Sequence, residues 1–424
     1  MRRKINSIFL TGLAAALVLT SCGLAEDAES TDTAEAVEAT EQSSQETETT
    51  AASQKETAPE YTIEENSQEA SDQDLFSYSC QKVTITDDQH EALKEAVSSY
   101  YDTLSTDGFE AFKEANQEDA QSLKDQGERE LNYSYGIYTD VERCDSQVLA
   151  LKVTVMEYTA GAHPNHLFNT VNFDVTTGEQ IDITDLGNIS DQAKEYILNQ
   201  LSESEEYTQG LFPEYEQTIT NDFDDLYQDF AFILNARGVE FIFQEYDIAP
   251  YAAGQVSFTV PYSQLDSLDT DYLPKDSFYS FAFTENLHEK VDLNNDGSLE
   301  ELYFTTTYPT DNTIESTVYV DGQSVTPSDA ANATFGQVYF AHATSGNYIF
   351  QDLTLDDGSH VTYLYEVTDG INQIGKEDGR GVVSIADGTV ELGVYDNETY
   401  DWTDVKTYSY NTDENGFKEV ETAE

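Results

Sequence analysis

The chain has 424 residues, with 83 Asp and Glu against 19 Lys and Arg, so its formal net charge is −64. This length predicts two or three domains. An excess of acid this large argues against nucleic-acid binding, because no basic surface is available to neutralise phosphates. It argues equally against docking on anionic lipid through protein charge. Aromatic residues make up 12% of the chain, which is enough to build folded cores.

The first 22 residues predict export and anchoring. A basic start over residues 2–4 is followed by an apolar run over 8–19, which is too short to span a bilayer comfortably and favours a signal peptide. The run ends in Leu19-Thr20-Ser21-Cys22, which resembles the bacterial lipobox. That resemblance implies diacylation of Cys22, which would hold the protein on the extracytoplasmic face of the bacterial cell membrane. The alternative is a secreted protein with a chance cysteine.

Residues 23–75 have the composition of a disordered segment. They hold 16 acidic residues, one Lys and a single aromatic residue, Tyr61. Such a segment cannot bury enough apolar area to offset chain entropy, so we expect a disordered acidic stalk. Residues 76–424 hold 67 acidic and 15 basic residues, a net charge of −52, so the folded part is acidic in its own right.

Cys80 and Cys144 are the remaining cysteines. An even pair in an exported region predicts a disulfide between them, with reduced thiols as the alternative.

Residues 76–285 are predicted to form an α+β domain, in which helices pack on an antiparallel sheet. Apolar residues recur at helical spacing after Asp88 and Glu91, which resemble a capping box, and again over 109–123 and from Ser190. Period-two alternation predicts strands over 133–138, 148–158, 168–175, 231–234, 239–243 and 256–260. Helices and strands mix without a βαβ rhythm, which favours the α+β class.

Three stretches of this domain go beyond generic patterning. Residues 158–165 (Tyr-Thr-Ala-Gly-Ala-His-Pro-Asn) lead into 172–178, and a later stretch over 246–254 precedes Pro261. In combination they resemble the extracellular domain of lysozyme-sensing anti-sigma factors of the RsiV type, a domain also found in PdaC-type peptidoglycan deacetylases. The resemblance covers about 80–270. The residues that match the family motif are Gly161, His163, Asn165, Asp174, Gly178, Tyr246, Pro250, Tyr251 and Gly254.

The resemblance implies a protein-binding role, with lysozyme as the known partner of the family. The sensing role is not expected, because the sequence shows neither a sigma-binding segment nor a transmembrane helix. We expect Gly161 and Gly254 to supply backbone freedom at tight turns. Ala160 and Gly187 depart from the family pattern, where a second Gly and a Phe are usual.

Other residues of this domain give weaker indications. His163 and His166 form an H-x-x-H pair, which is either a metal-ligand pair or part of a structured turn. Paired carboxylates such as Asp224 and Asp225 would suit glycosidase chemistry only across a cleft, and no nucleophile motif is present, so we assign no catalytic residue.

Residues 286–424 are predicted to form a mostly-β domain of hairpins. Asp-Gly begins at 296, 321, 357, 369, 378 and 387, and Asn-Gly begins at 415. These dipeptides are strong hairpin signals, so we expect a sheet, a sandwich or an incomplete propeller.

The sharpest motif of this second domain is a candidate calcium loop over 292–300. Side-chain oxygens at relative positions 1, 3 and 5, with Gly at 6, match the needs of a tight calcium loop. The candidate ligands are Asp292, Asn294, Asp296, Ser298 and Glu300. The alternative is an Asx-rich hairpin turn without metal.

These observations predict a surface-anchored, non-enzymatic binding lipoprotein of the bacterial cell envelope, with lysozyme or another cationic protein as its partner. The alternatives are an enzyme, or an accessory to one, that acts on cell-wall glycan, and a calcium-dependent adhesin or glycan-binding protein.

Overall fold

The computed structural model describes residues 57–70, 75–127, 133–225, 230–268, 270–275, 278–294, 296–368, 370–399, 401–411 and 416–420. Residues 55–424 form one compact unit. The predicted signal peptide, the lipidation residue Cys22 and most of the predicted stalk lie outside the described residues. No helix in the described part of the chain is long and apolar enough to cross a membrane.

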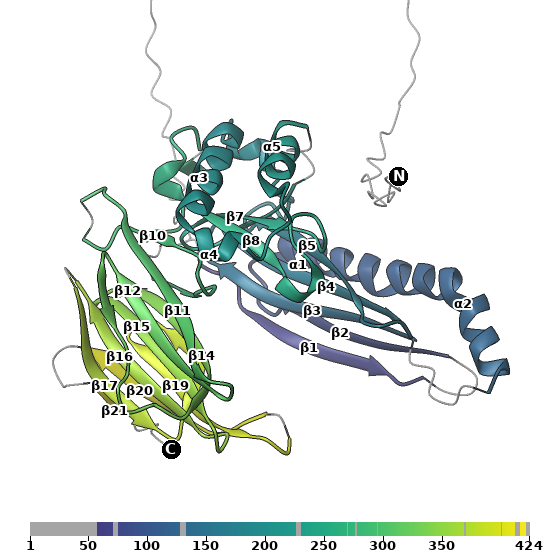
Figure 1. Cartoon of the computed structure of the whole chain (residues 1–424). Coiled ribbons are helices and arrows are strands. Elements are labelled where there is room, and N and C mark those ends of the chain that lie inside the picture. The colour runs from purple at the N-terminus through teal and green to yellow at the C-terminus, as the bar shows by residue number, and fades with distance from the viewer. Residues whose placement is uncertain are drawn as a thin grey trace, which may run out of the picture. The chain divides into compact units, whose positions relative to one another are not determined.

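The first layer of the fold is a five-stranded sheet with strand order β1-β2-β3-β4-β5. Its strands are β1 (Tyr61–Gln68), β2 (Phe76–Ile85), β3 (Tyr133–Cys144), β4 (Val148–Thr159) and β5 (Asn165–Asp174). Helices α1 (Glu91–Asp102) and α2 (Phe109–Asp125), joined by a π-helical turn, pack on one face (Figure 1). Alternate residues of β4, such as Leu149 and Leu151, point into the core beneath these helices, as the period of a strand requires.

Strand β1 corrects the predicted stalk. All eight of its side chains are exposed, yet its backbone pairs with β2 from Tyr61 opposite Ile85 to Gln68 opposite Tyr78. The disordered stalk therefore does not extend to residue 75. Composition missed this strand because backbone hydrogen bonds, rather than apolar burial, hold it in the sheet.

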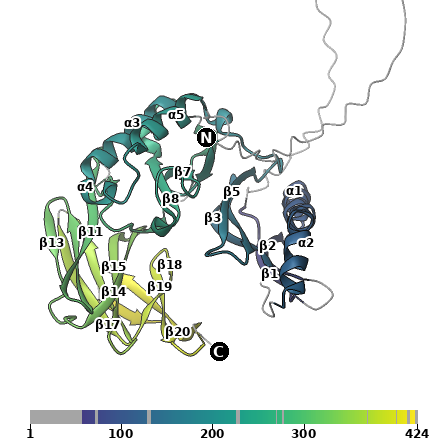
Figure 2. The ribbon, with the colours of Figure 1, turned by 45° about the vertical axis from the view of Figure 1, so that its right-hand side comes forward.

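The second layer is a three-stranded sheet, β6 (Ala231–Leu234), β7 (Gly238–Phe243) and β8 (Val256–Pro261). Helices α3 (Ser190–Glu203) and α5 (Tyr215–Asp225) lie over it, and the short α4 (Glu205–Thr208) follows α3 (Figure 2). Val148 and Ala150 enter this second core from the opposite face of β4. The start of β4 is therefore buried on both faces, which explains its continuous apolar sequence.

A buried side-chain amide joins the two layers. Asn172 on β5 donates from Nδ2 to the carbonyl of Phe232 (3.1 Å), and its Oδ1 accepts the N–H of Leu234 (2.8 Å). Asn172 is only 2% exposed. Its amide pairs with β6 as the peptide group of a neighbouring strand would, and so it satisfies two backbone groups that water cannot reach.

The rest of the chain forms three antiparallel sheets, with strand orders β17-β16-β15-β14-β9, β10-β11-β12-β13 and β18-β19-β20-β21. The strands of the first are β9 (Tyr279–Ala282), β14 (Ala333–Ala343), β15 (Gly346–Leu355), β16 (His360–Val367) and β17 (Ile371–Asp378). Those of the second are β10 (Glu289–Val291), β11 (Glu300–Thr310), β12 (Thr313–Val320) and β13 (Gln323–Val325). Those of the third are β18 (Gly381–Ala386), β19 (Thr389–Asp396), β20 (Asp401–Asn411) and β21 (Gly416–Glu419).

The sheet that contains β15 packs against both of the others. Ile349 lies in the core shared with β10–β13, whereas its neighbour Phe350 lies in the core shared with β18–β21. Successive side chains of a strand point to opposite faces, so both faces of β15 are covered. The mostly-β prediction for this part of the chain agrees with these sheets.

The Asp-Gly dipeptides mark the hairpins, as predicted. They join β12 to β13 at Asp321, β15 to β16 at Asp357, and β18 to β19 at Asp387, and the Gly after each has a positive φ. The predicted domain boundary after residue 285 is wrong in detail. Strand β9 lies before it but pairs with β14, and Leu287 lies after it but packs into the core beneath α3 and α5.

The structure corrects the predicted disulfide, since Cys80 and Cys144 are both free thiols. Cys80 lies beside Ile137 in the parallel β2–β3 pair, and Cys144 is seven residues farther along β3. At ~3.3 Å per residue this separates the two by roughly 20 Å, whereas a disulfide needs Cα atoms within about 7 Å.

We predict that Asn172→Ala lowers the free energy of unfolding by about 2–3 kcal/mol, because it leaves the buried carbonyl of Phe232 and N–H of Leu234 without partners. Urea denaturation of residues 55–424 measures the change. Asn169→Ala is the matched control on the same strand. Its longer hydrogen bond, 3.5 Å to the carbonyl of Leu167, is solvent-exposed, so we expect a change within about 0.5 kcal/mol. Equal effects of the two substitutions would contradict the assignment.

We also predict that neither thiol of the folded unit reacts with Ellman's reagent at pH 8. Cys80 is 2% exposed, and burial with the nearby Asp145 and Asp87 raises the pKa of Cys144 to about 12. After unfolding in guanidinium without reductant, both thiols should titrate. A count of zero after unfolding would show that a disulfide exists after all.

Candidate functional site

The sequence motif residues meet where the β4–β5 turn approaches the loop after β7. The ring of His163 stacks on Tyr251 with centroids 3.9 Å apart, and its Nε2 lies 3.1 Å from the hydroxyl of Tyr246. The rings of Tyr246 and Tyr251 are also stacked, at 6.4 Å. His163, His166, Tyr246 and Tyr251 are called the Tyr–His patch below. His163 lies in the β4–β5 turn and His166 at the start of β5, whereas Tyr246 and Tyr251 lie between β7 and β8.

Polar side chains after β7 hold the two halves of the patch together. The side-chain amide of Gln244 pairs with the backbone of Phe168, accepting its N–H at 2.9 Å and donating to its carbonyl at 2.8 Å. The carboxylate of Glu245 contacts Nδ1 of His166 at 2.7 Å and accepts the N–H of His166 at 3.3 Å. These contacts occupy the free edge of β5 at its first residues, and they fix the loop after β7 against it.

The backbone of the patch is strained at two residues. Ala160 has φ = 56° and Tyr246 has φ = 68°, a region that L-residues other than Asn and Asp rarely adopt. Gly254 has φ = 70°, as predicted for a residue that supplies backbone freedom. Gly161 does not have a positive φ, so that prediction was wrong: the left-handed residue is its neighbour Ala160. Strain of this kind concentrates at binding sites and implies that neighbouring contacts hold the loop in place.

The patch presents aromatic surface in acidic surroundings. The side chain of Tyr246 is 51% exposed, and His163 is exposed beside it. Desolvation and the negative charge of Glu245 raise the pKa of Tyr251, so its hydroxyl stays protonated and can donate at neutral pH. Burial raises the pKa of Asp247, although the N–H of Gln244 donates to its carboxylate and opposes the shift. An amphipathic ring surface flanked by carboxylates suits contact with a cationic protein.

Four other motif residues lie outside the patch, at turns and at the ends of strands. Asp174 and Gly178 lie at the far end of β5, where the carboxylate of Asp174 accepts the N–H groups of Thr176 and Thr177. Gly178 has φ = 72°, and a Cβ there would lie 2.6 Å from the backbone of Ala92 on α1. Pro250 has an extended backbone and caps the turn that carries Tyr251, and Asn165 begins β5. The motif thus combines one candidate surface with turns that support the fold.

The two histidines have different hydrogen-bonding partners. Nε2 of His163 lies 3.1 Å from the hydroxyl of Tyr246, whereas Nδ1 of His166 lies 2.7 Å from the carboxylate of Glu245. In the part of the chain that the structure describes, no group of three or more His, Cys, Asp or Glu side chains is arranged to hold a metal ion.

The candidate calcium loop joins β10 to β11 and is exposed. Asp292 accepts the N–H groups of Asp296 (3.2 Å) and Gly297 (3.0 Å). Asp296 accepts the N–H of Ser298 (2.8 Å), and this hydrogen bond lowers the pKa of Asp296. Glu300 accepts the N–H of Leu293 and the side-chain N–H of Asn294. The side-chain oxygens of the loop thus accept its own backbone N–H groups, as in an Asx-rich turn.

Two residues of the site, Gln244 and Glu245, were not predicted from the sequence. Both follow a strand in a polar stretch, where Gln and Glu are ordinary surface residues. Their role depends on β5 lying opposite them, which no local pattern encodes. Asn172 did fall within the quoted motif, but nothing in the sequence indicated that its amide would pair with a strand.

Residues 182–263 match the model of the DUF3298 family, whose description is "protein of unknown function". This stretch contains α3–α5, β6–β8 and the Tyr246–Gly254 half of the site. A solved structure of a DUF3298 family member from Bacteroides fragilis NCTC 9343 is 16% identical, with a TM-score of 0.38. It matches over 51% of this chain and 96% of that one. A DUF3298 family protein from Pseudomonas aeruginosa PAO1 is 13% identical, with a TM-score of 0.32 and the same coverage. No curated protein matches the chain.

Proposed function

We propose that the protein is a non-enzymatic binding lipoprotein of the bacterial cell envelope, anchored through Cys22, and that the Tyr–His patch is its recognition surface. The observation that carries this proposal is the exposed, strained Tyr246, which stands beside His163 and Tyr251. Aromatic side chains that are rigidly held and half exposed are typical of protein-binding surfaces.

A basic lysozyme is the proposed partner. The resemblance to the RsiV-type domain supports it, because the motif residues that carry the resemblance supply most of the patch. Charge supports it too. With a net charge of −52 over residues 76–424, the surface attracts a cationic protein and increases its rate of encounter.

We predict that a basic lysozyme binds to residues 55–424 in ~50 mM salt, and that higher salt weakens the complex. Tyr246→Ala and Tyr251→Ala should each weaken binding at least about tenfold, as expected for aromatic residues at the centre of an interface. Titration calorimetry measures both effects. Tyr308→Ala is the matched control, since Tyr308 on β11 is 70% exposed and distant in sequence from the patch.

The absence of any heat of binding for the unsubstituted protein would refute the lysozyme proposal. An equal loss of affinity in Tyr308→Ala would refute the assignment of the patch. A separate assay tests the enzymatic alternative. Release of acetate or reducing ends from peptidoglycan by residues 55–424 would show that the protein acts on cell-wall glycan.

We propose further that the loop over 292–300 binds calcium through side chains that turn toward the ion, since Asp292, Asp296 and Glu300 do not form a metal-ligand cluster in this structure. Asp292 and Asp296 each use their carboxylate to accept backbone N–H groups, and each oxygen keeps a lone pair for a cation. The loop resembles the weak calcium sites of extracellular modules, whose affinities of ~10⁻⁴–10⁻³ M suit extracellular calcium.

The calcium proposal predicts a higher melting temperature in calcium than in EGTA. A ligand at ~100 times its dissociation constant stabilises the folded state by about 2.7 kcal/mol. Asp292→Asn keeps one oxygen to accept one of the two N–H groups but removes a charge, so it should abolish most of the difference. Scanning calorimetry in both solutions is the measurement. Identical midpoints for the unsubstituted protein would exclude a calcium site of this strength.

A further inference from the structure

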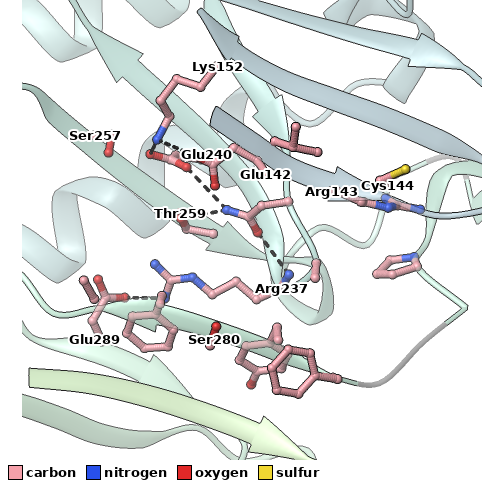
Figure 3. Close-up of a pocket in the computed structure, with 18 of the residues that line it drawn as sticks. Glu142, Arg143, Cys144, Lys152, Arg237, Glu240, Ser257, Thr259, Ser280 and Glu289 are labelled. Atoms are coloured by element: carbon pink, nitrogen blue, oxygen red, sulfur yellow. Dashed lines mark hydrogen bonds and ion pairs between the residues drawn. The ribbon is translucent and has the colours of Figure 1, made fainter. Parts of the chain in front are cut away.

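A cavity of about 930 Å³ lies where β7 and β8 face the edge strand β9 (Figure 3). In this view Lys152 and Glu240 lie above Arg237, and Ser280 and Glu289 lie below it. The volume falls within the range of sites that bind small molecules. The cavity is separate from the Tyr–His patch: no residue of the patch lines it.

The charged side chains in the cavity already have partners. Lys152 lies 3.1 Å from Glu142 and 3.2 Å from Glu240, and Arg237 lies 2.8 Å from Glu289. The side chains of Glu240 and Glu289 are buried, and the other three are half-buried. A charged ligand would have to separate one of these pairs and leave a buried charge without its partner, which is costly. The cavity therefore favours a neutral ligand.

Some hydrogen-bond donors of the cavity are not used by these ion pairs. Arg143 lines the cavity and is 5% exposed, and it contacts Asp145 at 2.7 Å and the carbonyl of Tyr272 at 2.7 Å. Its Nη2 is buried and has no hydrogen-bond partner among the described residues. Arg237 has five N–H donors in its guanidinium, and one of them is used by Glu289. Because Nη2 of Arg143 has no accessible surface, the guanidinium donors that a ligand can reach are those of Arg237.

Hydroxyl groups and aromatic rings complete the lining. Ser257 on β8, Ser280 on β9 and Thr284 make no side-chain hydrogen bond to another described residue. Ser280 and Thr284 are exposed, so the cavity is accessible from solvent. Phe278 and Tyr279 line the same space. A ligand that matches this lining carries hydroxyl groups that both donate and accept, and C–H faces that pack on rings.

We propose that this cavity binds a short, neutral oligosaccharide. Sugar hydroxyls can donate to Glu142, Glu240 and Glu289 and accept from the guanidinium donors of Arg237 that Glu289 does not use, without separating the ion pairs. Charge-assisted hydrogen bonds of this kind are stronger than those between neutral groups. The same reasoning excludes inorganic phosphate as a ligand, because the cations are already neutralised. The glycan site is independent of the Tyr–His patch, so either proposal can fail alone.

Titration calorimetry of residues 55–424 with chitotetraose, cellotetraose and maltotetraose tests this inference. At least one of the three sugars should bind with a dissociation constant below ~1 mM. Ser280→Trp places a large ring in the cavity from an exposed position, and it should weaken binding tenfold or more. Ser324→Trp is the matched control on exposed β13, and it should leave the affinity within twofold. Matching thermal midpoints of the two variants ensure that both are folded.

Arg237→Lys gives a second readout, since it keeps a cation beside Glu289 but removes the guanidinium donors that Glu289 does not use. Sugar binding should weaken several-fold. The inference is overturned if none of the three sugars binds at ~10 mM, if Ser280→Trp and Ser324→Trp bind alike, or if inorganic phosphate binds in preference to all three sugars.

Discussion

The structure depends on how the outer edge of β5 is closed. An edge strand leaves unpaired N–H and C=O groups, and here side chains and a short loop pair with them in place of a sixth strand. Gln244 pairs with Phe168 and Glu245 pairs with His166, while Asn172 and Asp174 bond to the returning chain through Ile181 and Glu179. On the face of the same strand, the amide of Asn172 pairs with β6. These bonds attach the layer of α3–α5 and β6–β8 to the five-stranded sheet.

That attachment is what creates the candidate recognition surface. His163 and His166 lie in the β4–β5 turn and at the start of β5, whereas Tyr246 and Tyr251 lie in the loop between β7 and β8, so neither layer alone presents the patch. Two left-handed non-glycine residues, Ala160 and Tyr246, persist because their loops are held at both ends. The resulting site is rigid, aromatic and acidic in its surroundings. A rigid site loses less conformational entropy when it binds a partner, and so its affinity is higher.

Sequence patterns predicted the parts of the fold that are governed by local chemistry. The helix over 109–125, the strands near Val148 and Phe168, and the Asp-Gly hairpins follow from periodicity and turn geometry. The capping box at Asp88 was wrong, since Asp87 accepts the N–H groups of Gln89 and His90 instead. Strand β1 was missed because nothing in it is buried, and β9 because its partner β14 lies more than fifty residues later. The patch residues were found through a family resemblance, whereas Gln244, Glu245 and the cavity required the tertiary structure.

The central claim is that side-chain amides close β5 and dock the two layers on each other. Backbone amide exchange of residues 55–424, resolved by NMR, tests it directly. Among the described residues, the N–H groups of Phe168 and Leu234 have only the side chains of Gln244 and Asn172 as acceptors, so both should exchange as slowly as the central strands β3 and β4. Exchange of either N–H at the rate of an exposed loop would contradict the docking, and with it the assembly of the patch from two layers.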